Sequence, residues 1–213
     1  MTMLIQSKDN PKLKQLRGLI EQSSLRKKQQ QTVLEGAHLI ESYLESNHQP
    51  ICMFTTEDGF DDLENQHAIE MSTCPLFLLP DTIYKSLSLL GQSTPLMAII
   101  DIPQINQGFN SKIDTLILDC VQDPGNVGTL LRSAAAVGIK QVITTKGTAS
   151  LWSPRVLRAA MGAHFSLAVF ENQEADNIVE HFSIPVYATS SHQPQSIYTL
   201  DLTQPCVWVL GNE

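Results

Sequence analysis

The segment LDCVQDPGNVGTLLRSAAAVGI, residues 118–139, places a single arginine, Arg132, in a stretch that is otherwise small and apolar. An apolar run ends before Pro124, and the residues that follow predict a helix over 127–137 that ends at Gly138. A guanidinium is a permanent cation with five N–H donors, so it can clamp a phosphate or stabilise an oxygen that becomes negatively charged. The simpler alternative is a helix-face residue that pairs with Glu213 or an aspartate. Asn126, just before the expected helix, is a natural N-cap.

The sequence lacks the motifs of other common sites, such as nucleotide-binding loops, hydrolase nucleophiles and cysteine metal sites. The turn at 123–128 is neither G-x-G-x-x-G nor a Walker loop, and the chain contains no G-x-S-x-G. The six histidines share no spacing with a nucleophile, and the four cysteines are widely spaced without a C-x-x-C pair. We therefore expect reduced, buried thiols and no metal site.

Strands and helices alternate from Thr115 onward, which predicts a parallel α/β sheet covered by helices. The expected strands are 115–121, 141–145, 165–170, 185–190 and 206–210, and the expected helices are 127–137, 154–162 and 173–182. Ligands bind at the carboxyl ends of parallel strands, so the informative residues follow each apolar run. These are 123–128 with Arg132, then 146–148, Thr189 with Ser190, and 211–213.

The first hundred residues have a different pattern, which indicates a small α/β domain. It predicts helices at 11–22 and 36–46, a strand at 51–55 and an acidic loop at 57–64, and it contains apolar runs at 76–79 and 96–100. Residues 101–112 are rich in Pro, Gly and Asn, as linkers are. We expect a domain at 1–100, a linker at 101–112 and a second domain at 113–213.

Charge is unevenly distributed along the chain. The net charge is −8, yet residues 1–34 carry +5 and the remainder carries −13. The basic side chains that could meet nucleic-acid phosphates are Lys12, Lys14, Arg17, Lys27 and Lys28. A solvated helix surface is the alternative interpretation. No apolar stretch approaches the roughly 20 residues of a membrane span, and the N-terminus lacks the apolar core of a signal peptide, so we expect a cytoplasmic protein.

Three segments carry a resemblance to a known family. DCVQDPGNVGTLLRSAAAVGI, SPRVLRAAMGAHF and VWVLGNE resemble the first motif, the middle helix and the start of the second motif of the SpoU/TrmH family. Its members are ribose 2′-O-methyltransferases of the SPOUT superfamily that use S-adenosylmethionine. The segments IQSKDNPKLKQLRGL and TVLEGAHLIESYLES resemble the substrate-binding domain that precedes the catalytic domain in many members.

The resemblance implies a trefoil-knotted α/β domain, a homodimer, and an RNA substrate, with ribosomal RNA favoured over transfer RNA. It places Arg132 at the essential arginine of the family, with Asn126 and Glu213 orienting Arg132 or the substrate. It assigns the cofactor loops to four residues: Thr189, Ser190, Leu210 and Gly211. Arg155 and Arg158, on the middle helix, are either RNA contacts or solubilising charges.

Two other functions stay open at this point. One is a non-catalytic RNA-binding protein with a decayed methyltransferase domain, and the other is a different nucleotide-binding α/β enzyme. The sequence stops within the second motif, and the third motif of the family is absent. We therefore expect the 213 residues to be part of a longer protein whose remainder completes the cofactor pocket.

Overall fold

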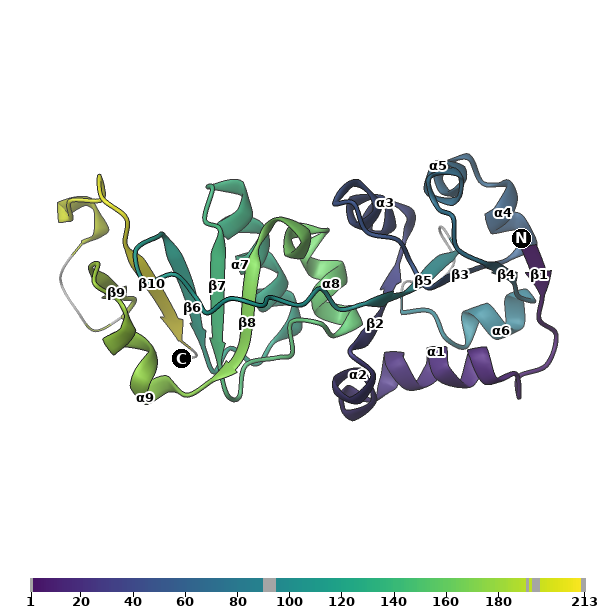
Figure 1. The fold of residues 1–213 in the computed structure, drawn as a ribbon, viewed down its shortest axis with the longest axis horizontal. Coiled ribbons are helices and arrows are strands. Elements are labelled where there is room, and N and C mark those ends of the chain that lie inside the picture. The colour runs from purple at the N-terminus through teal and green to yellow at the C-terminus, as the bar shows by residue number, and fades with distance from the viewer. Residues whose placement is uncertain (1, 90–94, 191, 193–195, 212–213) are drawn as a thin grey trace.

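The computed structural model contains two five-stranded sheets that lie side by side (Figure 1). The structure describes residues 2–89, 95–190, 192 and 196–211. The chain passes from the first unit to the second through the segment between β5 (Leu96–Asp101) and β6 (Thr115–Asp119). Among the described residues, no helix is both long and apolar enough to cross a bilayer.

The first sheet is mixed, with the strand order β1-β4-β3-β5-β2. β1, β4 and β3 are parallel, and β5 runs antiparallel to both β3 and β2. The remaining bounds are β1 (Thr2–Leu4), β2 (Gln31–Glu35), β3 (Cys52–Thr55) and β4 (Leu76–Leu78). The strand expected at 51–55 is confirmed as β3, and the apolar runs at 76–79 and 96–100 form β4 and β5. β2 was not predicted, because its apolar part is only the short segment that follows three glutamines.

Helices cover both faces of this sheet, as Figure 1 shows. They are α1 (Pro11–Glu21), α2 (Ser23–Gln29), α3 (Ala37–Glu45), α4 (Glu57–Asp61), α5 (Leu63–Met71) and α6 (Asp81–Lys85). The predicted acidic loop at 57–64 is wrong. Thr56 and Asp62 each cap a helix there by accepting a backbone N–H, and acidic residues in a first turn are stabilised by the helix dipole.

The second sheet is parallel throughout, as predicted, with the order β8-β7-β6-β10-β9. Its other strands are β7 (Gln141–Thr145), β8 (Ala168–Gln173), β9 (Val186–Ala188) and β10 (Val207–Gly211). β8 begins three residues later than expected because residues 163–166 form a 3-10 turn. β6 and β10 lie next to each other although they are far apart in the sequence.

The helices of the second unit differ from the predictions mainly at their ends. They are α7 (Pro124–Ala136), α8 (Pro154–Ala160) and α9 (Ala175–Ile178). α7 begins three residues earlier than expected, because proline suits the first turn of a helix. The helix expected at 173–182 is reduced to α9 and a 3-10 turn at 179–181.

The two units share one hydrophobic core. It runs from Ile40 and Tyr43 of α3 to Val127 of α7 and Leu157 of α8, all buried. The hydroxyl of Thr32 on β2 donates to the carbonyl of Trp152 at 2.7 Å, and both residues are buried. The units are therefore packed against each other directly as well as joined by the linker.

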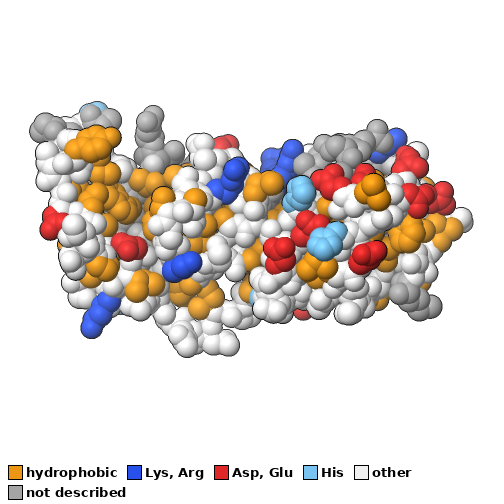
Figure 2. Space-filling view, turned by 90° about the horizontal axis from the view of Figure 1, so that it is seen from above, with side chains coloured by type: hydrophobic (Ala, Val, Ile, Leu, Met, Phe, Trp, Pro, Cys, Tyr) orange, Lys and Arg blue, Asp and Glu red, His pale blue; other side chains and the backbone are white. Residues whose placement is uncertain are grey.

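Acidic side chains gather on one face of the first unit (Figure 2). α4 and α5 lie on this side, whereas α1 and α2 cover the opposite face of the sheet (Figure 1). The positive charge of the N-terminal segment is thereby separated from the acidic face, and it lies on the side where α2 approaches the second unit.

Candidate functional site

The carboxyl ends of β6 and β10 meet at one edge of the second sheet. Gly211, the last residue of β10, lies opposite Asp119, the last residue of β6. The N–H of Thr189, just after β9, donates to a β10 carbonyl at 3.1 Å. Leu210 is half-buried next to Gly211, and Ser190 is exposed. The structure thus brings the four predicted cofactor residues to the same edge, where parallel sheets bind ligands.

The loops that follow β6 and β7 are tied together at this edge. The hydroxyl of Thr145 donates to the carboxylate of Asp119 at 2.6 Å and accepts the N–H of Cys120 at 3.1 Å. Cys120 and Gly147 have φ angles of 54° and 92°, and a Cβ on Gly147 would lie 3.3 Å from the sulfur of Cys120. These contacts hold the start of α7 at a fixed place beside the loop after β7.

α7 begins with a side-chain cap, but the capping residue is not Asn126. The carboxylate of Asp123 accepts the N–H of Asn126 at 2.7 Å, so Asp123 is the N-cap. The expectation that Asn126 caps the helix is wrong, because the helix starts at Pro124 and makes Asn126 its third residue. The side chain of Asn126 is exposed, and Asp123 takes the capping position. Glu213, the third predicted catalytic residue, lies outside the described residues.

Arg132 of α7 shares an open cavity of about 470 Å³ with Arg155 and Arg158 of α8. We call this cavity the arginine groove; its other lining residues are Leu89, Ala159 and Met161. Arg158 donates to the carbonyl of Leu89 at 3.3 Å, so the first unit forms one wall. Within the described part of the chain, no carboxylate forms an ion pair with any of these three arginines. Three cations without counter-charge form a site for an anion such as phosphate.

A close approach of α7 and α8 positions these arginines. Gly128 is buried, and a Cβ on it would lie 2.3 Å from the Cβ of Ala159 and 2.8 Å from the backbone of α8. Gly128 lies one turn before Arg132, and Ala159 lies one turn after Arg155, so each pair shares a helix face. The glycine therefore lets the two helices come close enough to place Arg132 beside Arg155.

The arginine groove continues as a row of cavities between the two units. A second cavity, of about 500 Å³, shares Leu89 and Arg155 with the arginine groove and is also lined by Pro124 at the start of α7. A third cavity, of about 250 Å³, shares Arg26 and Ser150 with the second. Together they form a path that passes the loops at the carboxyl ends of β6 and β7. This path is lined by cations from both units and also by the carboxylates of Glu21 and Glu171.

Arg26 of α2 is the buried cation on this path, with 7% of its surface exposed. Its guanidinium donates to the carbonyls of Leu19 and Ile20 at 2.7 and 3.1 Å, which caps the carboxyl end of α1. Its Nε has no hydrogen-bond partner. Burial lowers the pKa of Arg26, and the nearby carboxylate of Glu171 raises it.

The five predicted RNA-binding cations are divided between two helices. Lys12, Lys14 and Arg17 are on α1, and Lys27 and Lys28 are on α2. Lys14 forms an exposed ion pair with Asp9 at 3.0 Å, and Lys12 is half-buried. Lys27 lines the third cavity of the path. The positions of the other four are consistent with either of the interpretations given above.

Comparisons with known proteins agree with this arrangement. Residues 115–213 match the SpoU rRNA Methylase family, and residues 10–98 match the MRM3-like substrate binding domain. A TrmH-family protein of solved structure from Porphyromonas gingivalis is 30% identical, and the match covers 93% of this chain and 78% of that one, with a TM-score of 0.76. The chain belongs to the SpoU/TrmH family.

Other relatives of this SpoU/TrmH chain include a mitochondrial rRNA methyltransferase 3B from Danio rerio, 33% identical over 72% of this chain and 36% of its own length. The chain thus spans about a third of that relative. A solved RNA 2′-O ribose methyltransferase is 28% identical, and the match covers 99% of this chain and 82% of that one, with a TM-score of 0.83. The SpoU methyltransferase AviRb from Streptomyces viridochromogenes, solved with AdoMet, is 18% identical with 96% and 82% coverage and a TM-score of 0.85, which shows the shared fold.

Sequence reasoning about this SpoU/TrmH chain missed the side chains that join the two units. No local pattern in the sequence assigns a role to Arg26, Glu171 or Leu89. Glu171 lies between the strand expected at 165–170 and the helix expected at 173–182, and Leu89 belongs to the first unit. Neither has a local pattern that predicts a cavity, because the cavity arises only when the units pack together.

Proposed function

We propose that the protein transfers the methyl group of S-adenosylmethionine to a ribose 2′-hydroxyl of RNA, with ribosomal RNA favoured over transfer RNA. The observation that carries the proposal is the arginine groove, where Arg132, Arg155 and Arg158 converge without a counter-charge. The groove lies in a chain of the SpoU/TrmH family, whose solved relative is named as an RNA 2′-O ribose methyltransferase. RNA is a polyanion, so unpaired cations between two units support its binding.

The residues at the carboxyl ends of β9 and β10 fit the cofactor. A Cβ on Gly211 would have its nearest neighbour at 3.9 Å, so the backbone there is open to close approach. We assign Thr189, Ser190, Leu210 and Gly211 to hold it; AviRb, a protein of the same fold, was solved with AdoMet. The cofactor supplies an electrophilic methyl group on a sulfonium.

Arg132 has the chemistry to assist the attacking ribose oxygen. A hydroxyl becomes a stronger nucleophile as it loses its proton, and a guanidinium stabilises the negative charge that develops on the oxygen. Arg132 also holds an adjacent phosphate, which keeps the ribose in line. A guanidinium has five N–H donors and no acceptor atom, so Arg132 does not take the proton, which leaves to a phosphate oxygen or to water. Asn126 and Glu213 are assigned to orient Arg132 or the RNA.

A methyl-transfer assay with radiolabelled S-adenosylmethionine and unmodified ribosomal and transfer RNA transcripts tests this proposal. Arg132→Lys keeps the charge but removes the bidentate fork, and we expect at least a tenfold loss of rate, about 1.4 kcal/mol of transition-state stabilisation. Lys140→Gln, at the amino end of β7, is the matched control and keeps its rate. RNA binding without methyl transfer by the natural full-length protein would indicate a decayed methyltransferase domain instead.

We also infer that the protein forms a homodimer, that its C-terminal domain is knotted as in SPOUT proteins, and that it is cytoplasmic. The four cysteines are all free, which supports a reducing compartment. Light scattering measures the oligomeric state, and cell fractionation measures the location. A monomer at micromolar concentration, or a protein found only in another compartment, would contradict the respective inference.

A further inference from the structure

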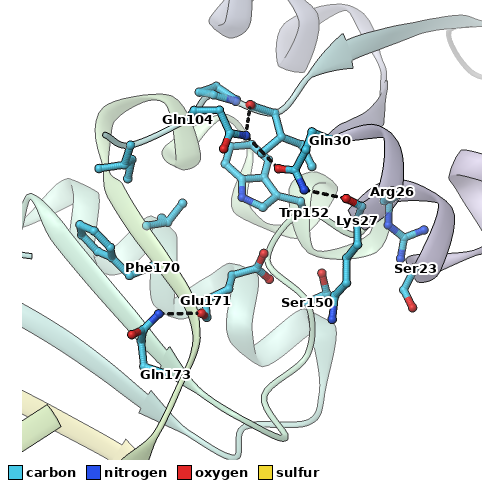
Figure 3. Close-up of a pocket in the computed structure, with 14 residues that line it drawn as sticks. Ser23, Arg26, Lys27, Gln30, Gln104, Ser150, Trp152, Phe170, Glu171 and Gln173 are labelled. Atoms are coloured by element: carbon cyan, nitrogen blue, oxygen red, sulfur yellow. Dashed lines mark hydrogen bonds between the residues drawn. The ribbon is translucent and has the colours of Figure 1, made fainter. Parts of the chain in front are cut away.

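The third cavity of the path is lined by side chains that have no part in the proposed phosphate binding by the arginine groove. We call it the linker pocket; it lies between α2, the segment 102–105 and β8. Its volume of about 250 Å³ is below the roughly 300 to 1,000 Å³ of pockets for drug-sized ligands, which suits one planar group. Figure 3 shows Trp152 at its centre, with the side chain of Glu171 on one side and Lys27 on the other.

Hydrogen-bond acceptors face the pocket from one wall. Glu171 accepts the N–H of Leu151 at 2.6 Å, which fills one of the four acceptor positions of its carboxylate. Gln173 uses its Nε2 on the carbonyl of Glu171 at 2.9 Å, so the amide oxygen of Gln173 is left as an acceptor. This wall therefore offers a carboxylate and an amide oxygen to a ligand that donates.

The facing wall holds the donors. Gln104 directs its Nε2 to the carbonyl of Ile102 and to the amide oxygen of Gln30, both at 2.9 Å, and Gln30 donates to the carbonyl of Lys27 at 2.7 Å. These bonds fix α2 to the linker and hold Lys27 at the pocket. Its ammonium forms no ion pair with any residue that the structure describes.

We propose that the linker pocket binds a guanine base of single-stranded RNA next to the bound backbone, an inference that rests on the RNA function proposed above. Guanine is the base whose Watson–Crick edge combines one acceptor, O6, with two adjacent donors, N1–H and the N2 amino group. Lys27 matches O6, and the carboxylate of Glu171 matches the two donors. Single-stranded RNA is commonly recognised by bases that stack on aromatic rings and bond through this edge.

The position of the linker pocket, next to the cavities that lead to the arginine groove, also supports a base of bound RNA as its ligand. The pocket shares Arg26 with the second cavity, which in turn shares Arg155 with the arginine groove. A strand whose phosphates lie on the arginines of the arginine groove can turn one base into the pocket along the cavities that connect the two. Arg26, whose buried Nε has no hydrogen-bond partner, lines both of these cavities.

Two fluorescein-labelled heptamers test the inference with the whole chain: seven uridines, and the same strand with guanosine in the middle. We expect at least fivefold tighter binding of the guanosine strand, about 1 kcal/mol, when both are measured by fluorescence anisotropy. Glu171→Gln replaces the acceptor by an amide, and we expect it to bring the affinity ratio close to one without weakening the uridine strand more than twofold.

Lys27→Gln gives a second variant that folding defects do not confound, because Lys27 is exposed. It lowers the ratio, whereas Lys28→Gln, on the same helix but outside the pocket, weakens both strands by the same factor. Equal binding of the two strands by the wild type, or an unchanged ratio in Glu171→Gln, would overturn the guanine pocket and leave the RNA function standing. Failure to bind either strand would overturn both.

Discussion

Replacing Gly128 with alanine perturbs the contact that holds α7 against α8. The added Cβ would lie 2.3 Å from the Cβ of Ala159, and 2.8 Å from the carbonyl carbon of Ala159 and from the nitrogen of Ala160. Carbon atoms in good contact are about 3.5 to 4.0 Å apart. Two of the three atoms belong to the α8 backbone, so no side-chain rotation relieves the clash, and the helices must separate by about 1 Å.

The expected net destabilisation is about 2 kcal/mol. Overpacking of a filled core costs typically about 1 to 3 kcal/mol, and a clash with backbone belongs at the upper end of that range. Alanine is a better helix former than glycine by about 1 kcal/mol, which offsets part of the loss. The same separation moves Arg132 away from Arg155, and misplacement by about 1 Å can lower a rate by about a hundredfold. We therefore expect methyl transfer to fall by more than the loss of stability explains.

Urea unfolding followed by tryptophan fluorescence measures the effect on the correct unit. Both tryptophans of the chain, Trp152 and Trp208, lie in the second unit. Thr129→Ala is the matched control, because it also improves helix propensity next to Gly128 but on the exposed side, and it should be neutral or slightly stabilising. A Gly128→Ala protein as stable as the wild type would refute the close packing of α7 on α8.

Three further predictions concern the cap, the buried histidine and the basic segment. Asp123→Ala removes the N-cap of α7 and should cost about 1 kcal/mol in urea unfolding, whereas Asp123→Asn, which keeps an acceptor, should cost less; equal losses would contradict capping. Burial lowers the pKa of His164 to about 4, so the unfolded chain, with a pKa near 6.5, binds a proton that the folded chain does not. The free energy of unfolding should fall by about 2 kcal/mol from pH 7 to pH 5, over and above the pH dependence of a His164→Gln protein. Lys28→Gln should lower the slope of log affinity for single-stranded RNA against log salt by about 0.7, and Lys14→Gln, whose ammonium pairs with Asp9, by less; the reverse order would place the RNA on α1.

The parallel sheet could be predicted because each of its strands is a short apolar run followed by a turn. β7 has the bounds that the sequence indicates, and β10 differs by one residue. Helix starts were less predictable. Asn126 and Asp123 are both good caps, and only the position of Pro124 in the first turn decides between them. The strand β2 was missed because its pattern is too short to separate from the glutamines before it.

The candidate site could be predicted only in the part that one unit supplies. The sequence singles out Arg132 by its contrast with an apolar helix, and the strand-end residues by the rule for parallel sheets; their roles stay predictions. The arginine groove also needs Leu89 of the first unit, and the linker pocket needs Lys27 on α2 to face Glu171 on β8. Such contacts depend on how two hydrophobic faces pack, which has no local signal in the sequence.

The apolar character of α7 and the presence of Arg132 have the same cause. The buried residues of α7 are Val127, Gly128, Leu131 and Ala134, a stripe that packs against α8 and the sheet. Small residues in this stripe let α8 approach to backbone contact, so the side chains that flank the contact on both helices point along one cleft. An arginine one turn from Gly128 then lies next to the arginines of α8 without being buried itself. A larger residue at position 128 would leave Arg132 chemically unchanged but alone, which is why the glycine is as much a part of the anion site as the guanidinium.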